Sequence, residues 1–181
     1  MVKTFRENDD KTPIILMGYA NPIEAIGAGT FVERAKSSDV DGIITVDYPP
    51  EECMEFTKLL KEKNIDSIFL LSPTSELDRV KLIIEQASGF LYYVSLKGVT
   101  GAANIDIEQV KSKVGMIREL TDLPIGVGFG VKDAATAKEV AKISDAVVVG
   151  SRMVQEIESS NKENLIQNIS KLMKELREAV N

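Results

Sequence analysis

Three glycine-bearing turns contain the residues whose types and spacing could do chemistry. Glycine lets the backbone approach an anion closely, and amides at a turn or a helix start direct partial positive charge toward it. Turns that follow successive parallel strands meet at one end of a sheet, so the pattern predicts a phosphate site; the alternative is ordinary strand-to-helix loops. Each turn follows an apolar run: Gly98-Val99-Thr100-Gly101, Gly128-Phe129-Gly130 and Gly150-Ser151.

The residue inventory limits the acid–base chemistry. The sequence has no histidine and one cysteine, Cys53, which excludes a disulfide, a Cys/His zinc site and a histidine-activated nucleophile. We expect no metal site, and we expect Cys53 to be a packing residue. Acid–base groups must then be carboxylates, tyrosine or lysine. Lys97 leaves open a Schiff-base aldolase. Asp47 leaves open a catalytic acid, although we favour a role in holding the loop at 48–50.

Length and charge indicate the class of protein. A chain of 181 residues with 44% apolar content can bury one core, so we expect a single domain over residues 1–181. The net charge of -6 argues against nucleic acid or an anionic membrane as a partner. There is neither a signal peptide pattern nor an apolar run of roughly 18 residues. These features predict a soluble cytoplasmic protein.

Short apolar runs alternate six times with longer amphipathic segments, which is typical of an α/β fold. The runs are apolar throughout, as expected for parallel strands covered on both faces. The predicted strands are Pro13–Gly18, Gly42–Val46, Ser67–Leu71, Phe90–Ser95, Pro124–Gly128 and Ala146–Gly150. The predicted helices are Glu24–Ser37, Glu51–Lys63, Glu76–Gln86, Ile107–Leu120, Ala134–Lys142 and Glu163–Val180, with Ser75, Asp106 and Asp133 as N-caps of three of them.

The position of the glycines favours a barrel over an open sheet. The strands recur at roughly 25 residues, which suits both folds, but no Gly-x-Gly-x-x-Gly follows the first strand and the glycines cluster after the last three. We therefore predict a TIM (β/α)8-type barrel. Six units do not close eight strands, and Met1–Arg6 has the pattern of a helix end, so we expect an incomplete barrel. Open edges at its first and last strands predict self-association.

Four motifs, taken in order, closely resemble the tryptophan synthase alpha chain family, and the likeness covers essentially the whole chain. A fifth, Val148-Val149-Gly150-Ser151, follows them. The four motifs are Leu16-Met17-Gly18-Tyr19-Ala20-Asn21-Pro22, Val46-Asp47-Tyr48-Pro49-Pro50-Glu51-Glu52, Tyr92-Tyr93-Val94-Ser95-Leu96-Lys97-Gly98-Val99-Thr100-Gly101-Ala102 and Gly126-Val127-Gly128-Phe129-Gly130-Val131.

The resemblance implies a lyase that cleaves indole-3-glycerol phosphate to indole and glyceraldehyde 3-phosphate by a retro-aldol step in tryptophan biosynthesis. It also implies that indole passes to a beta chain in an α2β2 assembly, and that the pyridoxal phosphate belongs to that beta chain, with no cofactor in this chain. The six units would correspond to strands three to eight. The family's catalytic glutamate and aspartate lie on and after strand two, so we expect these 181 residues alone to be nearly inactive. The alternatives are a non-catalytic phosphate-binding or beta-chain-docking fragment and a phosphate-handling barrel with another substrate.

The resemblance also implies roles for individual residues. Tyr92 would lie beside the reacting indole as an auxiliary catalytic group, and Met17 would fill the barrel interior or line the indole pocket. The phosphate would be bound by Gly101, Gly130, Gly150 and Ser151. Thr100 and Phe129 would be loop residues near the substrate, and the beta chain would contact Asn21, Asp47 and Pro49.

Overall fold

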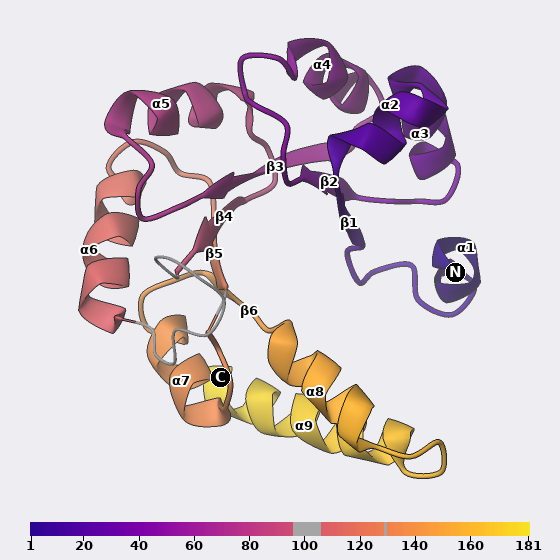
Figure 1. Ribbon diagram of the computed structural model, residues 1–181, viewed down its shortest axis with the longest axis vertical. Helices are drawn as coiled ribbons and strands as arrows, with labels where there is room; N and C mark the ends of the chain where they lie inside the picture. The colour runs from indigo at the N-terminus through magenta and orange to yellow at the C-terminus, as the bar shows by residue number, and fades with distance from the viewer. Residues whose placement is uncertain (96–105, 129) are drawn as a thin grey trace. The chain divides into compact units, whose positions relative to one another are not determined.

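The structure is a computed structural model that describes residues 1–95, 106–128 and 130–181 (Figure 1). The chain divides into two compact units, one formed by residues 1–70 and 76–91 and the other by residues 71–75 and 92–181. The predictions for Lys97, Thr100, Gly101 and Phe129 lie outside the described residues. No described helix is long and apolar enough to cross a membrane.

The first unit contains three parallel strands in sequence order, β1 (Ile15–Gly18), β2 (Gly42–Thr45) and β3 (Asp66–Leu71). Their register aligns Ile15 with Gly42 and Gly42 with Asp66. All three lie within or close to the predicted strands. The helices are α1 (Val2–Arg6), α2 (Ala20–Ile26), α3 (Ala28–Lys36), α4 (Met54–Glu62) and α5 (Leu77–Gln86).

One predicted helix of this unit was wrong in its extent. The segment predicted as a single helix over Glu24–Ser37 forms α2 and α3, which are separated by Gly27 at φ +87°. This is the left-handed region that glycine adopts without a steric penalty, and it interrupts the helical hydrogen-bond ladder. The expected helix at Met1–Arg6 is present as α1, and the Arg6 side chain fastens it to Asp39 and Asp41 ahead of β2.

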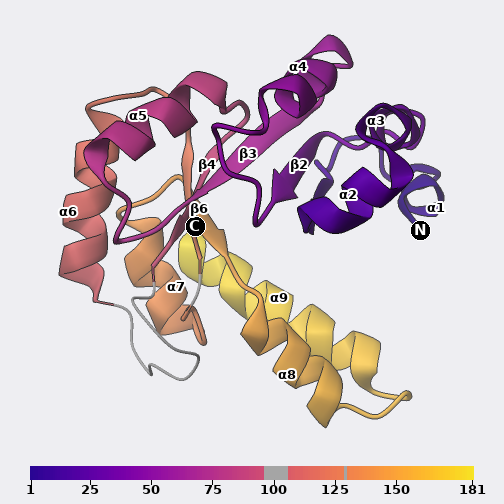
Figure 2. The same cartoon turned by 45° about the horizontal axis from the view of Figure 1, so that its top comes forward.

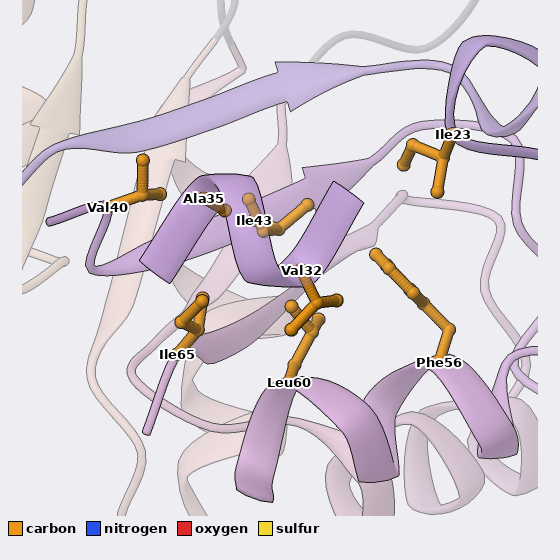
Figure 3. Packing of buried hydrophobic residues seen from close by; sticks show 8 residues of the cluster. All are labelled: Ile23, Val32, Ala35, Val40, Ile43, Phe56, Leu60 and Ile65. Atoms are coloured by element: carbon orange, nitrogen blue, oxygen red, sulfur yellow. The ribbon is translucent and has the colours of Figure 1, made fainter. Parts of the chain in front are cut away.

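The core of the first unit lies between the strands and helices α3 and α4 (Figure 3). Helical spacing places Val32 and Ala35 on one face of α3, and Phe56 and Leu60 on one face of α4. Burial of the larger side chains, Val32, Phe56 and Leu60, contributes about 1.5–3 kcal/mol each. The cluster therefore positions the loops at the ends of β1 and β2. Its members are Ile23, Val32, Ala35, Val40, Ile43, Phe56, Leu60 and Ile65.

The second unit contains β4 (Leu91–Val94), β5 (Ile125–Gly128) and β6 (Ala146–Val148), again in sequence order. β5 and β6 are parallel, and Gly128 is aligned with Val148. The helices are α6 (Ile107–Arg118), α7 (Ala134–Ala141), α8 (Ser151–Ser159) and α9 (Leu165–Val180). In Figures 1 and 2, α8 and α9 lie side by side, and α9 also packs against α7.

Two of the three predicted caps are confirmed. Asp106 accepts a hydrogen bond from Gln109 N, and Asp133 accepts one from Thr136 N. The cap at Ser75 was wrong: α5 begins after Glu76, and the Ser75 hydroxyl instead accepts from Ser72 N in the preceding turn. Helix α8 was not predicted. Its sequence has the spacing of an amphipathic helix, with Val154 and Ile157 on one stripe, so the signal was present in the sequence and was missed.

Candidate functional site

The ends of the three strands of the second unit are joined by short contacts. Ser95, directly after β4, donates from its backbone N (3.0 Å) and from its Oγ (2.7 Å) to the carbonyl oxygen of Gly128, the last residue of β5. Gly128 is in turn aligned with Val148, the last residue of β6. The segments that follow β4, β5 and β6 therefore leave from neighbouring positions at one end of the sheet.

Two of the predicted phosphate-turn glycines, Gly130 and Gly150, are among the described residues, and each lies two residues after the last residue of a strand that ends here. Gly130 lies two residues after Gly128 and has φ +79°, a conformation in which a side chain would be strained. Gly150 lies two residues after Val148 and is the N-cap of α8, where no side chain caps the helix. Ser151, the first residue of α8, is exposed. A helix start with free amides attracts an anion.

Tyr92 lies against the last residue of β5. Its side chain is 5% exposed, and a Cβ atom built on Gly128 would lie 2.7 Å from Cζ of Tyr92 and closer still to its hydroxyl. Burial raises the pKa of Tyr92, so the phenol is protonated at neutral pH and can donate a hydrogen bond. The structure thus brings Tyr92 to the strand end from which the Gly130 turn departs.

The residues predicted to face a partner lie in the first unit, after β1 and β2. Asp47 Oδ1 accepts a hydrogen bond of 2.7 Å from Ala20 N, at the start of α2, and Asn21 follows directly. Asp47, which was predicted to hold the loop at 48–50, makes this contact with the loop after β1, so its carboxylate ties the two loops to each other. Asn21 and Asp47 are exposed and Pro49 is partly exposed. The structure brings these three residues to adjoining loops.

Tyr48 links the same two loops a second time. Its hydroxyl donates to Oε1 of Glu24 on α2 over 2.5 Å. The hydrogen bond to the carboxylate, together with burial, raises the pKa of Tyr48 to about 12. The prediction of Cys53 as a packing residue is confirmed, since it is 2% exposed. Met17, in contrast, is half exposed and aligned with Ile44, so it does not fill a closed interior in this unit.

Within the described ranges, no three acidic or cysteine side chains gather in a way that could hold a metal ion. Sequence reasoning did not single out Ser95, although it joins two of the strand ends. The available signal was a serine that closes an apolar run three residues before the first glycine of a predicted turn, Gly98. A polar side chain at the end of a buried strand needs a partner, and the neighbouring strand's carbonyl is the nearest one.

The alternation of parallel strands with helices, with glycine turns at the ends of β5 and β6, defines an α/β protein of the (β/α)8-barrel type. The crystal structure of tryptophan synthase alpha chain from Legionella pneumophila subsp. pneumophila aligns with a TM-score of 0.87 and 36% identity, over 99% of this chain and 66% of that one. This likeness confirms the predicted incomplete barrel. Residues 1–181 match the tryptophan synthase alpha chain family, and the chain belongs to it.

Relatives within the family are similar over nearly all of this chain. The alpha chain of Janthinobacterium sp. (strain Marseille) is 54% identical over 179 residues, which are 99% of this chain and 68% of the relative. The alpha chain of Nitrosomonas europaea is 52% identical over 99% of this chain and 66% of its own length. A tryptophan synthase complex from Pyrococcus furiosus aligns with a TM-score of 0.85 and 32% identity, over 98% of this chain and 70% of that one. The chain spans about two thirds of the length of these relatives.

Proposed function

We propose that this chain supplies the phosphate-binding part of a lyase that cleaves indole-3-glycerol phosphate to indole and glyceraldehyde 3-phosphate. The observation that carries the proposal is the junction of strand ends in the second unit, where Ser95 binds Gly128 and Gly128 is aligned with Val148. The turn at Gly130 and the start of α8 at Ser151 leave from this junction. Amides at both places would bind the phosphate dianion of the substrate.

The cleavage step defines what else the site must contain. A retro-aldol reaction of an indole glycerol needs a proton for ring carbon three, a base for the departing hydroxyl proton, and stabilisation of the positive indolenine. In this proposal the protonated Tyr92 hydroxyl acts as an auxiliary hydrogen-bond donor beside the indole. The principal acids would be the glutamate and the aspartate that the family resemblance places on elements with no counterpart in these 181 residues.

The proposal therefore separates binding from turnover. General acid–base groups each supply about 10²–10⁴-fold in rate. These 181 residues by themselves would bind a phosphate ester and release indole very slowly. The second candidate is a non-catalytic phosphate-binding or docking role, which the residue inventory favours: the chain has no histidine to replace an absent carboxylate as the base.

We further propose a beta chain as the partner of the loops that carry Asn21, Asp47 and Pro49. Support comes from their exposure and from the hydrogen bond between Asp47 and Ala20, which brings the two loops together. The matched Pyrococcus furiosus structure is a tryptophan synthase complex. The pyridoxal phosphate of the second reaction would belong to that partner. Self-association through the edges of β1 and β6 would compete with these contacts, because each strand pairs on one side.

The test is complementation. This chain is mixed with a fragment that carries the part of the Janthinobacterium alpha chain beyond the matched region, and indole release from indole-3-glycerol phosphate is measured. Turnover that requires both pieces supports the lyase. A stable complex without indole release contradicts it. The matched variants are Ser151→Glu, which places a negative charge against the phosphate and should abolish turnover, and Lys138→Gln on the exposed side of α7, which should not change it.

Calorimetric titration of this chain with glycerol 3-phosphate separates the two candidates. Heat of binding that disappears in Ser151→Glu, together with failed complementation, favours the non-catalytic role. The absence of binding in the wild-type chain contradicts the phosphate site itself. Protection from proteolysis by an indole analogue, but not by a sugar phosphate, would support the indole substrate over another phosphate ester.

A further inference from the structure

The segment from Asp47 to Cys53, here called the β2–α4 loop, is held from two sides. On one side the loop is hydrogen-bonded to α2: Asp47 accepts from Ala20 N, and the Tyr48 hydroxyl donates to Glu24. On the other side the loop is hydrogen-bonded to α5 through Gln86, whose Nε2 donates to the carbonyl oxygen of Pro50 over 2.6 Å. The first side involves Asp47, which is exposed, and Tyr48, which is partly exposed. The second side holds the loop through Pro50, which is buried.

The Gln86 amide uses both of its ends in this contact. Its Nε2 binds Pro50 O, and its Oε1 lies 3.3 Å from Sγ of Cys53, which also lies 3.5 Å from Pro50 O. Pro50 is buried and Cys53 is 2% exposed. A buried carbonyl without a partner is costly, and proline offers no N–H with which the loop could rearrange its own hydrogen bonds.

A second contact between α5 and the loop is of a different kind. Arg79 Nη1 lies 3.4 Å from Oε1 of Glu51, and the two side chains are 49% and 54% exposed. Ion pairs this exposed contribute little because water screens them and both side chains lose freedom. The hold of α5 on the β2–α4 loop therefore depends on Gln86.

We infer that Gln86 is a positioning residue for the docking surface: it keeps the β2–α4 loop in the shape that presents Asp47 and Pro49 to the partner. The inference rests on the proposed function, because it takes the beta chain as that partner. A loop that is already ordered loses less conformational entropy on binding than a loose one, so its order increases affinity. Gln86 would act through the loop and would not itself contact the beta chain.

The chain contains its own reporter for this hold. Cys53 is the only cysteine, so a thiol reagent labels a single position. The Cys53 thiol is buried, and burial also raises its pKa, so labelling under native conditions requires the loop to open. Gln86→Glu keeps the shape of the side chain but replaces the donor to Pro50 O with a carboxylate oxygen. We expect labelling about tenfold faster, which corresponds to roughly 1.4 kcal/mol of loop stability.

Two controls separate this effect from general destabilisation. Arg79→Gln removes the exposed contact of the same helix and should label at the wild-type rate. Protonation restores a donor to Glu at position 86, so the ratio of the Gln86→Glu rate to the wild-type rate should fall as the pH approaches the carboxyl pKa. Gln86→Met, which has no donor at any pH, should keep its ratio constant, and it serves as the test variant if Gln86→Glu does not fold.

The decisive measurement adds affinity for a beta chain from a family complex. Faster labelling with about tenfold weaker binding in Gln86→Glu, and neither change in Arg79→Gln, supports the inference. Labelling at the wild-type rate overturns it. Faster labelling with unchanged affinity also overturns it, because Gln86 then serves the fold alone. If the wild-type chain binds no beta chain, the proposed partner fails and the docking inference with it, while the labelling rate still shows whether Gln86 holds the loop.

Discussion

Gly128→Ala should destabilise the chain because of one neighbour, Tyr92. The added Cβ would lie 2.7 Å from Cζ of Tyr92 and closer to its hydroxyl, whereas carbon atoms in contact are normally about 3.5–4.0 Å apart. The backbone of Gly128 cannot retreat easily. The Gly128 carbonyl oxygen accepts two hydrogen bonds from Ser95, and Gly128 is paired with Val148 on β6. The tyrosine ring must therefore move by about 1 Å.

The ring has little room for that movement, because only 5% of Tyr92 is exposed. Overpacking of this kind costs about 1–3 kcal/mol. Tyr92→Val removes the ring, so in that background the same Gly128→Ala change meets open space. Its cost should then fall to about 0.5 kcal/mol or less, within the range of ordinary substitutions away from special features. The expected coupling between the two positions is therefore about 0.5–2.5 kcal/mol.

Urea denaturation of the wild type, both single variants and the double variant measures this coupling directly. Tyr92→Val alone should also be destabilising, by the loss of buried surface and the cavity that it leaves. Gly115→Ala is the matched control, because a Cβ at Gly115 meets nothing within 4 Å. Costs that add within about 0.5 kcal/mol would refute the reasoning, since independent sites behave in that way. The conclusion would then be that Tyr92 does not determine the glycine at position 128.

Three further predictions concern stability. Tyr93→Phe should be neutral or stabilising by up to about 1–3 kcal/mol in urea denaturation, since the buried Tyr93 hydroxyl has no hydrogen-bond partner among the described residues; clear destabilisation would contradict this. Asp133→Ala should cost about 1 kcal/mol through loss of the α7 cap. The Thr136 hydrogen bond lowers the pKa of Asp133, so the wild-type advantage should be present above about pH 4 and fade as the pH falls through the lower folded pKa; an advantage that persists in acid would contradict the cap. Gly130→Ala should cost about 1–2 kcal/mol, the penalty of a side chain at φ +79°, and equal thermal stability of the variant and the wild type would contradict it.

The apolar runs predicted the strands, including β1 and β6, which are only partly buried, whereas periodicity misjudged two helical segments. The strands β2 and β5 are largely buried and were found within one residue of their predicted bounds. The single predicted helix over Glu24–Ser37 continued through Gly27, because one glycine in a helical pattern does not reveal its φ. Helix α8 was missed although Val154 and Ile157 have helical spacing, so this error lies in the interpretation of the pattern and not in the sequence.

The candidate site could also be predicted only in part. The turn glycines Gly130 and Gly150 could be predicted as turn residues that follow apolar runs, and the positive φ of Gly130 is a conformation that favours glycine, whereas the negative φ of Gly150 does not require it. The hydrogen-bond partners that hold the strand ends and loops of the site could not be predicted from the sequence. Whether Ser95 binds Gly128, or Asp47 binds Ala20, depends on the strand register that tertiary packing selects, and a serine or an aspartate at a strand end is compatible with several partners.

At Gly128 the sequence and the structure give different reasons for the same residue type. In the sequence it is one member of a Gly-Phe-Gly turn, and the turn alone would explain it. In the structure its φ is not positive, so its backbone conformation does not demand glycine. Tyr92 occupies the space that a side chain would need. Tyr92, on the neighbouring strand, therefore determines that position 128 is glycine. The proposed substrate contact at Tyr92 and the proposed phosphate turn that begins at Gly128 depend on each other, because a methyl side chain at position 128 would clash with the tyrosine ring.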